Sequence, residues 1–339
     1  MRPRALLAAI LSLALLAAAL LLPTSAGAGV VEPHVMFGTN SKRSDVDDIK
    51  GSILKSEQQL GRTLAAVRIY DNWDTKFPKG IHKWMRDGGR TMYLSVKSEK
   101  ENGVDVPWRQ VADAPNGSEI HLNIVRWARK IRNFGDVVHV TFNHEPETRH
   151  NDHLGDQDDY IDAWRRWVKV FRNQNADDNV VFTWIMTDHA FRVPQTDNRF
   201  AKKWYPGNKW VEEIGADVYN WHECRPEEDI PWRTPQHVAE GLRLFGLQHP
   251  NIPISMPEFA TVEDPATPGR KAQWIRDFED MLQTPEWSQL TTAIYFNRKG
   301  TAYPTCDWSF DSSPSSLTAI TELANDPFFG RSESINYPG

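Results

Sequence analysis

Short apolar runs alternate with longer segments of helical periodicity along most of the chain. Eight of these runs are rich in β-branched and aromatic residues, and they lie at 34–39, 65–71, 90–97, 137–144, 179–186, 214–220, 253–258 and 292–297. Strands that alternate with helices are typical of parallel βα units, and eight such units can close a barrel. The pattern therefore predicts an α/β fold that consists of a single (β/α)8 TIM barrel.

The intervening segments carry residues that start and end helices. Residues 157–174 place four aromatic side chains at helical spacing, so we expect this face to pack against the barrel. The other expected helices run over 45–60 after Ser44, from Asn116 or Ser118 to Gly135, over 235–248 after Thr234, after Thr267 to Leu282, and over 314–325 after Ser313. Residues 187–213 are the least regular, and we expect a long loop with short helices there.

Side chains of a strand alternate between its two faces, so each run divides into residues that face the helices and residues that face the barrel axis. In 65–71 this places Arg68 and Tyr70 on the inward face. The polar inward residues near the strand ends are Arg68, Asn143, Glu145, Asp217, Tyr219, Glu258 and Tyr295. A bulge near a strand end would shift the register by one residue and turn His144 inward instead.

These polar positions need an explanation, because packing alone would favour Val, Ile or Leu inside a barrel. One interpretation is a catalytic site, since such barrels carry their chemistry at the C-terminal ends of the strands. The alternative is an internal salt-bridge network, such as Arg68 with Asp217 or Glu258, that stabilises the barrel without catalysis. Glu145 and Glu258 favour the first interpretation, because two carboxyl groups at one end of a barrel suffice to cleave a glycosidic bond.

Short motifs at the ends of three runs occur in a characteristic order. His144 and Glu145 end the fourth run, Tyr219 lies in Gly-Ala-Asp-Val-Tyr-Asn in the sixth, and Glu258 lies in Pro-Glu-Phe in the seventh. With the segments 204–212 and 307–314, these motifs resemble glycoside hydrolase family 26, the β-mannanase-like family in a clan of (β/α)8 retaining glycosidases. The resemblance covers most of the chain after residue 28 and implies a glycoside hydrolase that cleaves O-glycosyl bonds.

The resemblance also implies residue roles. Glu145 matches the general acid/base, and Glu258 matches the nucleophile. Tyr219 matches the tyrosine that hydrogen-bonds the nucleophile, and His144 matches the histidine that precedes the acid. Arg68 matches, less closely, the arginine on the second strand across the wider clan.

The loop after Glu145 departs from the family pattern. Mannanases of the family commonly continue with Met-Asn-Gly and an aromatic-rich stretch, whereas this chain has Pro146-Glu147-Thr148-Arg149-His150. We expect a β-linked polysaccharide substrate, with β-1,4-mannan first and the substrates of a β-glucanase or xylanase of the clan second. A different class of function is an inactive barrel that binds polysaccharide. The presence of both glutamates argues against it.

Tryptophans and cysteines extend the predicted site. Fourteen Trp is a high number for this length, and Trp184, Trp221 and Trp308 are our candidates for stacking on sugars, whose apolar faces suit flat rings. Cys224 follows the sixth run and Cys306 follows the eighth, which places both at the predicted catalytic end. We expect a disulfide between them, although sequence alone leaves their proximity open.

Other polar residues carry weaker signals. The His-Asn-Asp-His cluster at 150–153 matches no strong ligand motif, and no cofactor motif is present, so we expect neither a metal nor a cofactor. The absence of a convincing ligand cluster also argues against a metal-dependent hydrolase on the same fold. Glu147, which lies beyond Pro146, is expected to be a loop charge.

The start of the chain indicates its destination. Met-Arg-Pro-Arg precedes an apolar stretch over 5–22 and then Ala26-Gly27-Ala28, an order typical of a secretory signal. We expect residues 1–28 to be removed, 29–330 to form the catalytic domain and 331–339 to be a polar tail. An uncleaved membrane anchor is the alternative. The net charge of −6, without a basic block, argues against nucleic acid, so we expect a secreted monomer with a polysaccharide partner and no membrane contact after cleavage.

Overall fold

The computed structural model describes residues 35–226, 228–301 and 303–330. The predicted signal segment 1–28 and the predicted tail 331–339 lie outside the described residues. Within the described ranges, no helix has the length and apolar character needed to span a bilayer.

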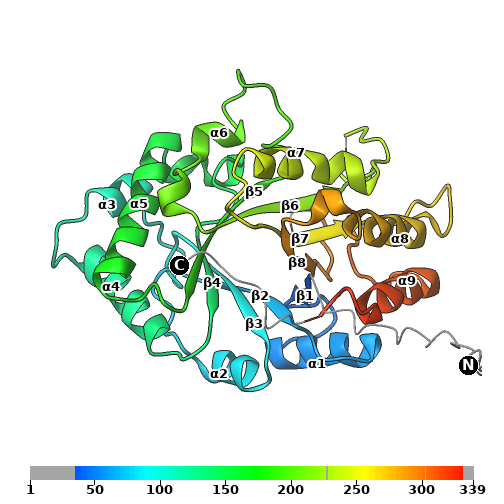
Figure 1. The fold of residues 1–339 in the computed structure, drawn as a ribbon, viewed down its shortest axis with the longest axis horizontal. Helices are drawn as coiled ribbons and strands as arrows, with labels where there is room; N and C mark the ends of the chain where they lie inside the picture. The colour runs from blue at the N-terminus through cyan, green and yellow to red at the C-terminus, as the bar shows by residue number, and fades with distance from the viewer. Residues whose placement is uncertain (1–34, 227, 302, 331–339) are drawn as a thin grey trace, which may run out of the picture. The chain divides into compact units, whose positions relative to one another are not determined.

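Eight parallel strands of the described chain close a barrel in sequence order (Figure 1). They are β1 (Met36–Asn40), β2 (Ala66–Asp71), β3 (Thr91–Val96), β4 (Val138–Phe142), β5 (Val180–Thr187), β6 (Glu213–Asn220), β7 (Ile254–Thr261) and β8 (Leu290–Tyr295). Each strand overlaps one of the predicted runs. The predicted single (β/α)8 barrel is therefore confirmed.

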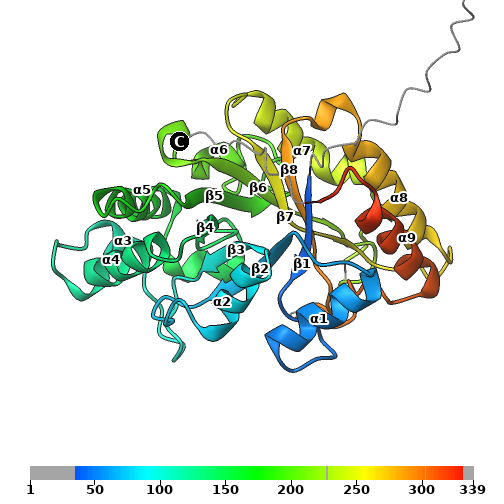
Figure 2. The same ribbon diagram turned by 60° about the horizontal axis from the view of Figure 1, so that its bottom comes forward.

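Helices surround the strands, as the turned view makes clear (Figure 2). The α-helices are α1 (Ile49–Leu60), α2 (Gly80–Asp87), α3 (Trp108–Ala112), α4 (Glu119–Arg132), α5 (Gln157–Asn173), α6 (Ala201–Trp204), α7 (Pro235–Leu247), α8 (Arg270–Leu282) and α9 (Pro314–Asn325). Short 3-10 helices are η1 (Arg149–Leu154), η2 (Asn208–Trp210) and η3 (Pro285–Trp287). The irregular segment 187–213 holds α6 and η2, as the sequence predicts.

Side-chain caps explain where several helices begin. The hydroxyls of Ser118, Thr234 and Ser313 accept backbone N–H groups at the starts of α4, α7 and α9, as predicted. Ser44 was the wrong cap for α1, because its hydroxyl accepts the N–H of Lys299 in the loop after β8. Asp48 caps α1 instead. Helix α8 follows Thr267 and ends at Leu282, as predicted, and its cap position is Gly269.

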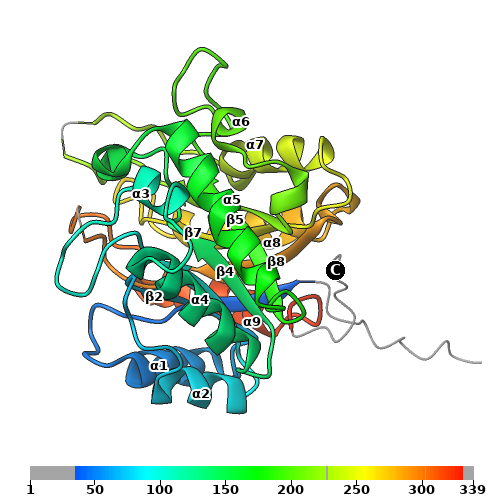
Figure 3. The same cartoon turned by 90° about the vertical axis from the view of Figure 1, so that its left-hand side faces the viewer.

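The aromatic face of α5 packs on the barrel, as expected. The ring of Trp167 stacks on Phe142 of β4 at 5.3 Å between centroids, and Tyr160 lies parallel to Phe142 at 6.3 Å. Figure 3 looks onto this side of the barrel, where α5 runs beside α3 and α4. These stacked rings hold β4 in position, and β4 leads directly to Glu145.

The barrel interior also contains a buried polar network at the starts of its strands. Glu213, the first residue of β6, is fully buried and lies 3.0 Å from His139 Nδ1. It accepts hydrogen bonds from the hydroxyls of Thr183, Thr291 and Tyr93. Burial alone would raise the pKa of Glu213, but His139 and the hydroxyl donors outweigh it and lower that pKa. The network joins β3, β4, β5, β6 and β8 at one level of the barrel.

Candidate active site

Glu258 lies in the second half of β7 and is surrounded by groups that stabilise a negative charge. The hydroxyl of Tyr219 donates to its Oε2 at 2.5 Å, and the hydroxyl of Tyr70 donates to Oε1. Arg68, which is completely buried, places Nε 3.7 Å from the same Oε1. A guanidinium and two hydroxyl donors therefore surround this carboxylate and can stabilise a negative charge on it.

Tyr70 also belongs to the site, although its position in the sequence does not single it out. Strand parity had placed it inward beside Arg68, and its ring lies under the guanidinium at 5.1 Å. Sequence alone does not assign Tyr70 to the site, because a tyrosine on a buried strand is equally compatible with core packing. Its contact with Glu258 becomes visible only when β2 and β7 are brought together across the barrel.

Glu145 sits three residues beyond the end of β4 in a sharply turned backbone. Asn143 and Glu145 both have left-handed backbone angles, with φ of 47° and 49°. Such angles cost free energy for residues other than glycine and persist only where surrounding contacts hold them. The N–H of Glu145 donates to the Ile185 carbonyl at 2.9 Å, and the Glu145 carbonyl accepts from Thr148 and Asn151. The turn thus fixes the direction of the Glu145 side chain.

The surroundings of Glu145 favour its protonated form. Burial is the largest cause that raises its pKa well above the usual range, and the negative charges of Glu258 and Glu147 add to it. Arg68 acts in the opposite direction but does not offset these effects. The two glutamates therefore differ in electrostatic environment, which is the requirement for one acid and one ionised carboxylate in the same site.

Asp217 is a third carboxyl group at this place. It pairs with Glu258 across β6 and β7, next to a register shift between Gly215 and Asp217. Burial raises its pKa well above the usual range, and Glu258 and then Glu145 contribute further. Three carboxyl groups and one guanidinium therefore meet at the C-terminal end of the barrel.

His144 reaches the same cluster. One ring nitrogen of His144 and carboxylate oxygens of Asp217 and Glu258 all lie within 4.8 Å of one another, and its ring contacts Tyr70 at 5.5 Å. Burial and then the charge of Arg68 lower its pKa well below 6.5, so the imidazole is neutral. Although these three groups are potential metal ligands, the fixed positive charge of Arg68 beside Glu258 makes the set a poor fit for a cation.

Two predicted residues do not reach this cluster. Trp184 is fully buried and packs edge-to-face on Tyr205 and Phe191 outside the barrel, because Thr183 occupies the inward face of β5. Tyr295 packs on Phe259, which stacks on α8, so it faces the helices rather than the axis. The register between β7 and β8 shifts twice. The strict alternation of inward and outward residues that was assumed for the eighth run therefore does not hold.

The side chains of Asn143 and Glu147 both accept hydrogen bonds from neighbouring backbone N–H groups. The Asn143 side chain accepts the N–H of Ser98 at 3.0 Å and so ties the turn after β4 to the loop after β3. Glu147 is not a solvated loop charge, since it is 4% exposed and accepts both the N–H and the hydroxyl of Thr187. Burial raises the pKa of Glu147 to about 7.

Trp221 and Trp308 lie beside the cluster. Trp308 is almost completely buried and contacts Tyr219 at 4.8 Å and Trp221 at 4.9 Å. The half-buried Trp221 ring is covered by the guanidinium of Arg225 at 3.6 Å. Cys224 and Cys306 form a disulfide, with an S–S length of 2.05 Å, between the loops after β6 and β8. These contacts join two rim loops around Tyr219, which in turn holds Glu258.

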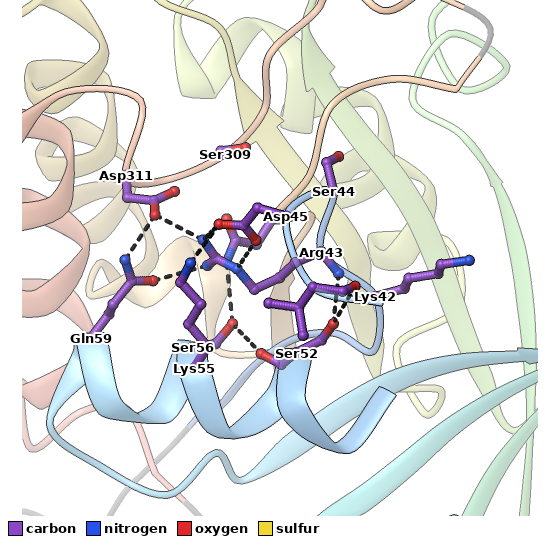
Figure 4. Close-up of polar contacts among 12 residues, drawn as sticks. Lys42, Arg43, Ser44, Asp45, Ser52, Lys55, Ser56, Gln59, Ser309 and Asp311 are labelled. Carbon is purple, nitrogen blue, oxygen red and sulfur yellow. Dashed lines mark hydrogen bonds and ion pairs between the residues drawn. The ribbon is translucent and has the colours of Figure 1, made fainter. Parts of the chain in front are cut away.

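Another network fixes the rim between β1 and β8. Arg43 is 3% exposed and donates to Asp45, Asp311 and Gln59 at 2.8 to 2.9 Å (Figure 4). It borders a polar pocket of about 310 Å³ whose walls include Lys299 and the loop around Ser309. Arg43 therefore joins the loop after β1 to the loop after β8 at the same end of the barrel as Glu258.

Comparisons with known proteins agree with this geometry. Residues 124–233 match the model of glycosyl hydrolase family 26, a range that includes Glu145 and Tyr219 and ends before Glu258. The predicted resemblance to family 26 is confirmed. Endoglucanase H of Acetivibrio thermocellus is 27% identical over 286 residues, which cover 80% of this chain and 29% of that protein. The chain thus spans less than a third of that relative.

Solved structures of mannanases share the fold. A family 26 β-mannanase from Bacteroides ovatus superposes with a TM-score of 0.58 at 16% identity, covering 89% of this chain and 92% of the other. An endo-β-1,4-mannanase double mutant from Cellulomonas fimi gives 0.61 at 14% identity, with 89% and 73% covered. The family match and the shared barrel support classification of the chain as a glycoside hydrolase.

Proposed function

We propose that the barrel hydrolyses β-linked polysaccharide by double displacement, with Glu258 as the nucleophile and Glu145 as the general acid/base. This proposal rests on one observation. The surroundings stabilise a negative charge on one carboxyl group and disfavour it on the other. Arg68, Tyr70 and Tyr219 stabilise a charge on Glu258. Burial and neighbouring negative charge keep the proton on Glu145.

The two steps use these states in turn. Glu145 gives its proton to the leaving glycosidic oxygen while a Glu258 oxygen bonds to the anomeric carbon, which forms a covalent glycosyl-enzyme. Glu258 then carries no charge, so one cause of the raised pKa of Glu145 disappears. Glu145 can now take a proton from water, whose oxygen attacks the anomeric carbon and releases Glu258 as a carboxylate.

The choice of polysaccharide rests on separate observations. The two similar structures named above are mannanases. Their sequences are only 14 to 16% identical to this chain, so the similarity shows a shared fold and not a shared substrate. The relative with the higher sequence identity, 27%, is named an endoglucanase, and this chain spans 29% of it. The loop after Glu145 also lacks the mannanase pattern, and its Glu147 is turned inward. We therefore propose a β-glucan as the first substrate to test and β-1,4-mannan as the second.

The test is a hydrolysis screen of the protein on β-glucans, mannan and xylan, with sizing of the products and NMR of the first anomer released. Retention of configuration and internal cleavage are expected. Glu258→Ala should abolish all turnover. Glu145→Ala should abolish polysaccharide cleavage yet still form the glycosyl-enzyme from an aryl glycoside, whose leaving group needs no proton.

Glu119→Ala is the matched control, because Glu119 is an exposed residue at the start of α4. It should keep full activity. Near-wild-type turnover in either Glu145→Ala or Glu258→Ala would contradict the role given to that residue. A protein that binds the glycans without cleaving any of them would support the alternative of an inactive binding barrel.

We also propose that the protein is secreted as a monomer after removal of residues 1–28. The order of basic, apolar and small residues at the start supports this, and a disulfide between Cys224 and Cys306 suits an oxidising compartment. N-terminal sequencing of protein from the culture medium should begin at Gly29. Recovery of the intact chain in a membrane fraction would instead indicate an anchor.

A further inference from the structure

The polar pocket between the loops after β1 and β8 opens on the rim of the barrel and has a volume of about 310 Å³. Two of its lining residues, Arg43 and Asn297, are buried, so the pocket reaches below the surface of the rim. Figure 4 shows part of its wall, with Arg43, Asp45 and Asp311 in contact. We call it the rim pocket, and the polar side chains that set its chemistry belong to Arg43, Asp45, Lys299, Asp307, Ser309 and Asp311.

Two carboxylates of the rim pocket are held in place and ionised. The Arg43 guanidinium donates to both oxygens of Asp45 and to Oδ2 of Asp311. The hydrogen bond from Arg43 is the largest cause that lowers the pKa of Asp45. Burial alone would raise the pKa of Asp311, but hydrogen bonds from Gln59 and Arg43 outweigh it and lower that pKa. A carboxylate offers about four acceptor positions, so both groups can also accept hydrogen bonds from a ligand.

The rim pocket offers donors as well. Lys299 is exposed, and its ion pair with Asp307 is long, at 3.7 Å, so its ammonium group is free to donate to a ligand. Ser309 is half-buried, and a hydroxyl can donate or accept. Such a mixture of acceptors and donors suits the hydroxyl groups of a sugar, each of which also does both.

A metal ion fits the rim pocket less well than a sugar. Within the part of the chain that the structure describes, the carboxyl groups of the pocket do not converge at distances that would hold a metal ion. The guanidinium of Arg43 also joins Asp45 to Asp311 and would repel a cation bound there. A neutral sugar is therefore the class of ligand that matches the lining.

The rim pocket is connected to the reaction centre through one side chain. Trp308 lies between Asp307 and Ser309 in the sequence, and both of these residues line the pocket. The ring of Trp308 contacts Tyr219 at 4.8 Å, and Tyr219 donates to Glu258. The pocket wall therefore continues into the contacts that hold the nucleophile.

Strand order places the rim pocket on the side of the barrel away from the proton donor. In the closed ring of strands, β8 lies directly across from β4, which leads to Glu145, and beside β7, which carries Glu258. The proton donor lies next to the leaving group, and the sugar that bonds to the nucleophile belongs to the other part of the chain. The pocket is thus on the side of the sugar units that stay on the enzyme after the first step.

We propose that the rim pocket is a subsite that binds one sugar unit of the polysaccharide on the non-reducing side of the scissile bond. Its volume lies near the lower end of the range for ligand pockets, which suits a single unit rather than a long stretch of chain. Asp45 and Asp311 accept hydrogen bonds from the sugar hydroxyls, and Lys299 and Ser309 donate to them. The inference rests on the proposed hydrolysis and adds which part of the substrate the enzyme holds.

The test is steady-state kinetics on aryl β-oligoglycosides of increasing length, built from the sugar of the best substrate. The aryl leaving group carries no sugar, so added units extend only the non-reducing side. The pocket variant is Lys299→Ala with Ser309→Ala, which keeps the Ser309 carbonyl that Lys271 contacts. The matched control is Lys169→Ala with Ser288→Ala, two exposed residues outside the pocket.

For wild type, kcat/KM should rise at the chain length that first reaches the rim pocket. The pocket variant should lose about tenfold or more of kcat/KM on the longer glycosides, because two hydrogen-bonding groups are removed, and should cleave the shortest glycoside like wild type. The control should match wild type at every length.

Two kinds of failure can be told apart. If wild type hydrolysed none of the glycosides and no polysaccharide, the proposed hydrolysis would be wrong, and the subsite with it. If wild type were active but the pocket variant lost nothing, or lost equally at all lengths, only the subsite would be wrong. A loss that appeared only when sugar units replaced the aryl group would place the pocket on the leaving-group side and would also contradict the proposal.

Discussion

Glu147 shows how a residue outside the reacting pair can set its protonation. Its negative charge is one of the causes that raise the pKa of Glu145, after burial and Glu258. Its own carboxylate is held by Thr187 rather than by substrate-facing groups. Glu147, two residues after the proton donor in sequence, therefore acts on the pKa of Glu145 through its charge.

We predict that Glu147→Gln shifts the alkaline limb of the kcat/KM profile to lower pH. The amide oxygen can still accept from Thr187, but the charge that raises the pKa of Glu145 is lost. Glu145 then loses its catalytic proton at lower pH, which is where activity would fall. Glu119→Gln, which removes an exposed carboxylate at the start of α4, serves as the control. An unmoved alkaline limb would show that Glu147 has no electrostatic influence on the donor.

The two tyrosines offer a second prediction at this scale. Tyr70→Phe and Tyr219→Phe each remove one hydroxyl donor from Glu258. A hydrogen bond to a charged group contributes about 1.5 to 3 kcal/mol, so we expect kcat to fall roughly ten- to hundredfold in each variant. Steady-state kinetics on the best substrate measure this. Equal thermal stability of both variants would separate the loss from misfolding.

At the scale of elements, the alternation of apolar runs with helical segments was enough to predict the barrel. Strands that are buried on both faces form continuous apolar runs, which are easy to recognise in a sequence. The end of β4 was harder to predict. The left-handed turns at Asn143 and Glu145 depend on contacts from β5 and η1, which no local pattern reveals. Tyr295 was assigned to the wrong face for a similar reason, since the bulges between β7 and β8 change the alternation.

The loop after β8 illustrates an element held by one buried side chain. Lys271 of α8 is fully buried, and its Nζ donates to the carbonyl of Ser309, the hydroxyl of Ser312 and, at 3.5 Å, the carbonyl of Asp307. Two of these carbonyls flank Trp308, which packs on Tyr219. The lysine thus supports the tyrosine that holds Glu258, although it lies on an outer helix.

Lys271→Met should therefore loosen the loop over 307–312. We expect faster hydrogen exchange in this segment and a lower kcat, because the position of Trp308 against Tyr219 is no longer fixed. Arg276→Met is a suitable control on the same helix, since Arg276 pairs with Glu322 at the surface. If exchange over 307–312 were as slow in Lys271→Met as in the control, the proposed support would be wrong.

For the whole molecule, the polar network around Glu213 sets a dependence of stability on pH. The pKa of Glu213 is lowered in the folded state, so its contribution is complete above the unfolded pKa and is lost as the pH falls through the folded value. Glu213→Gln removes the carboxylate that accepts from the hydroxyl donors of the network and should cost about 1.5 to 3 kcal/mol at neutral pH, the contribution of a hydrogen bond to a charged group.

Urea unfolding at pH 7 and at pH 4 measures this effect. The difference between wild type and Glu213→Gln should be smaller at the lower pH, because the Glu213 carboxylate of the unfolded chain takes up a proton before that of the folded chain. Glu240→Gln, at a surface pair with Arg243, should change little at either pH. An equal loss of unfolding free energy at both pH values would mean that the packing of the Glu213 side chain, and not its charge, explains its role.

The group of three carboxyls around Arg68 has a consequence for how the mouth of the barrel meets its ligands. The raised pKa values of Glu145 and Asp217 favour their neutral forms, which leaves the ion pair of Arg68 with Glu258 as the main charged contact at the reaction centre. An uncharged glycan then enters without long-range attraction or repulsion, so its kcat/KM should stay nearly constant between low and moderate ionic strength.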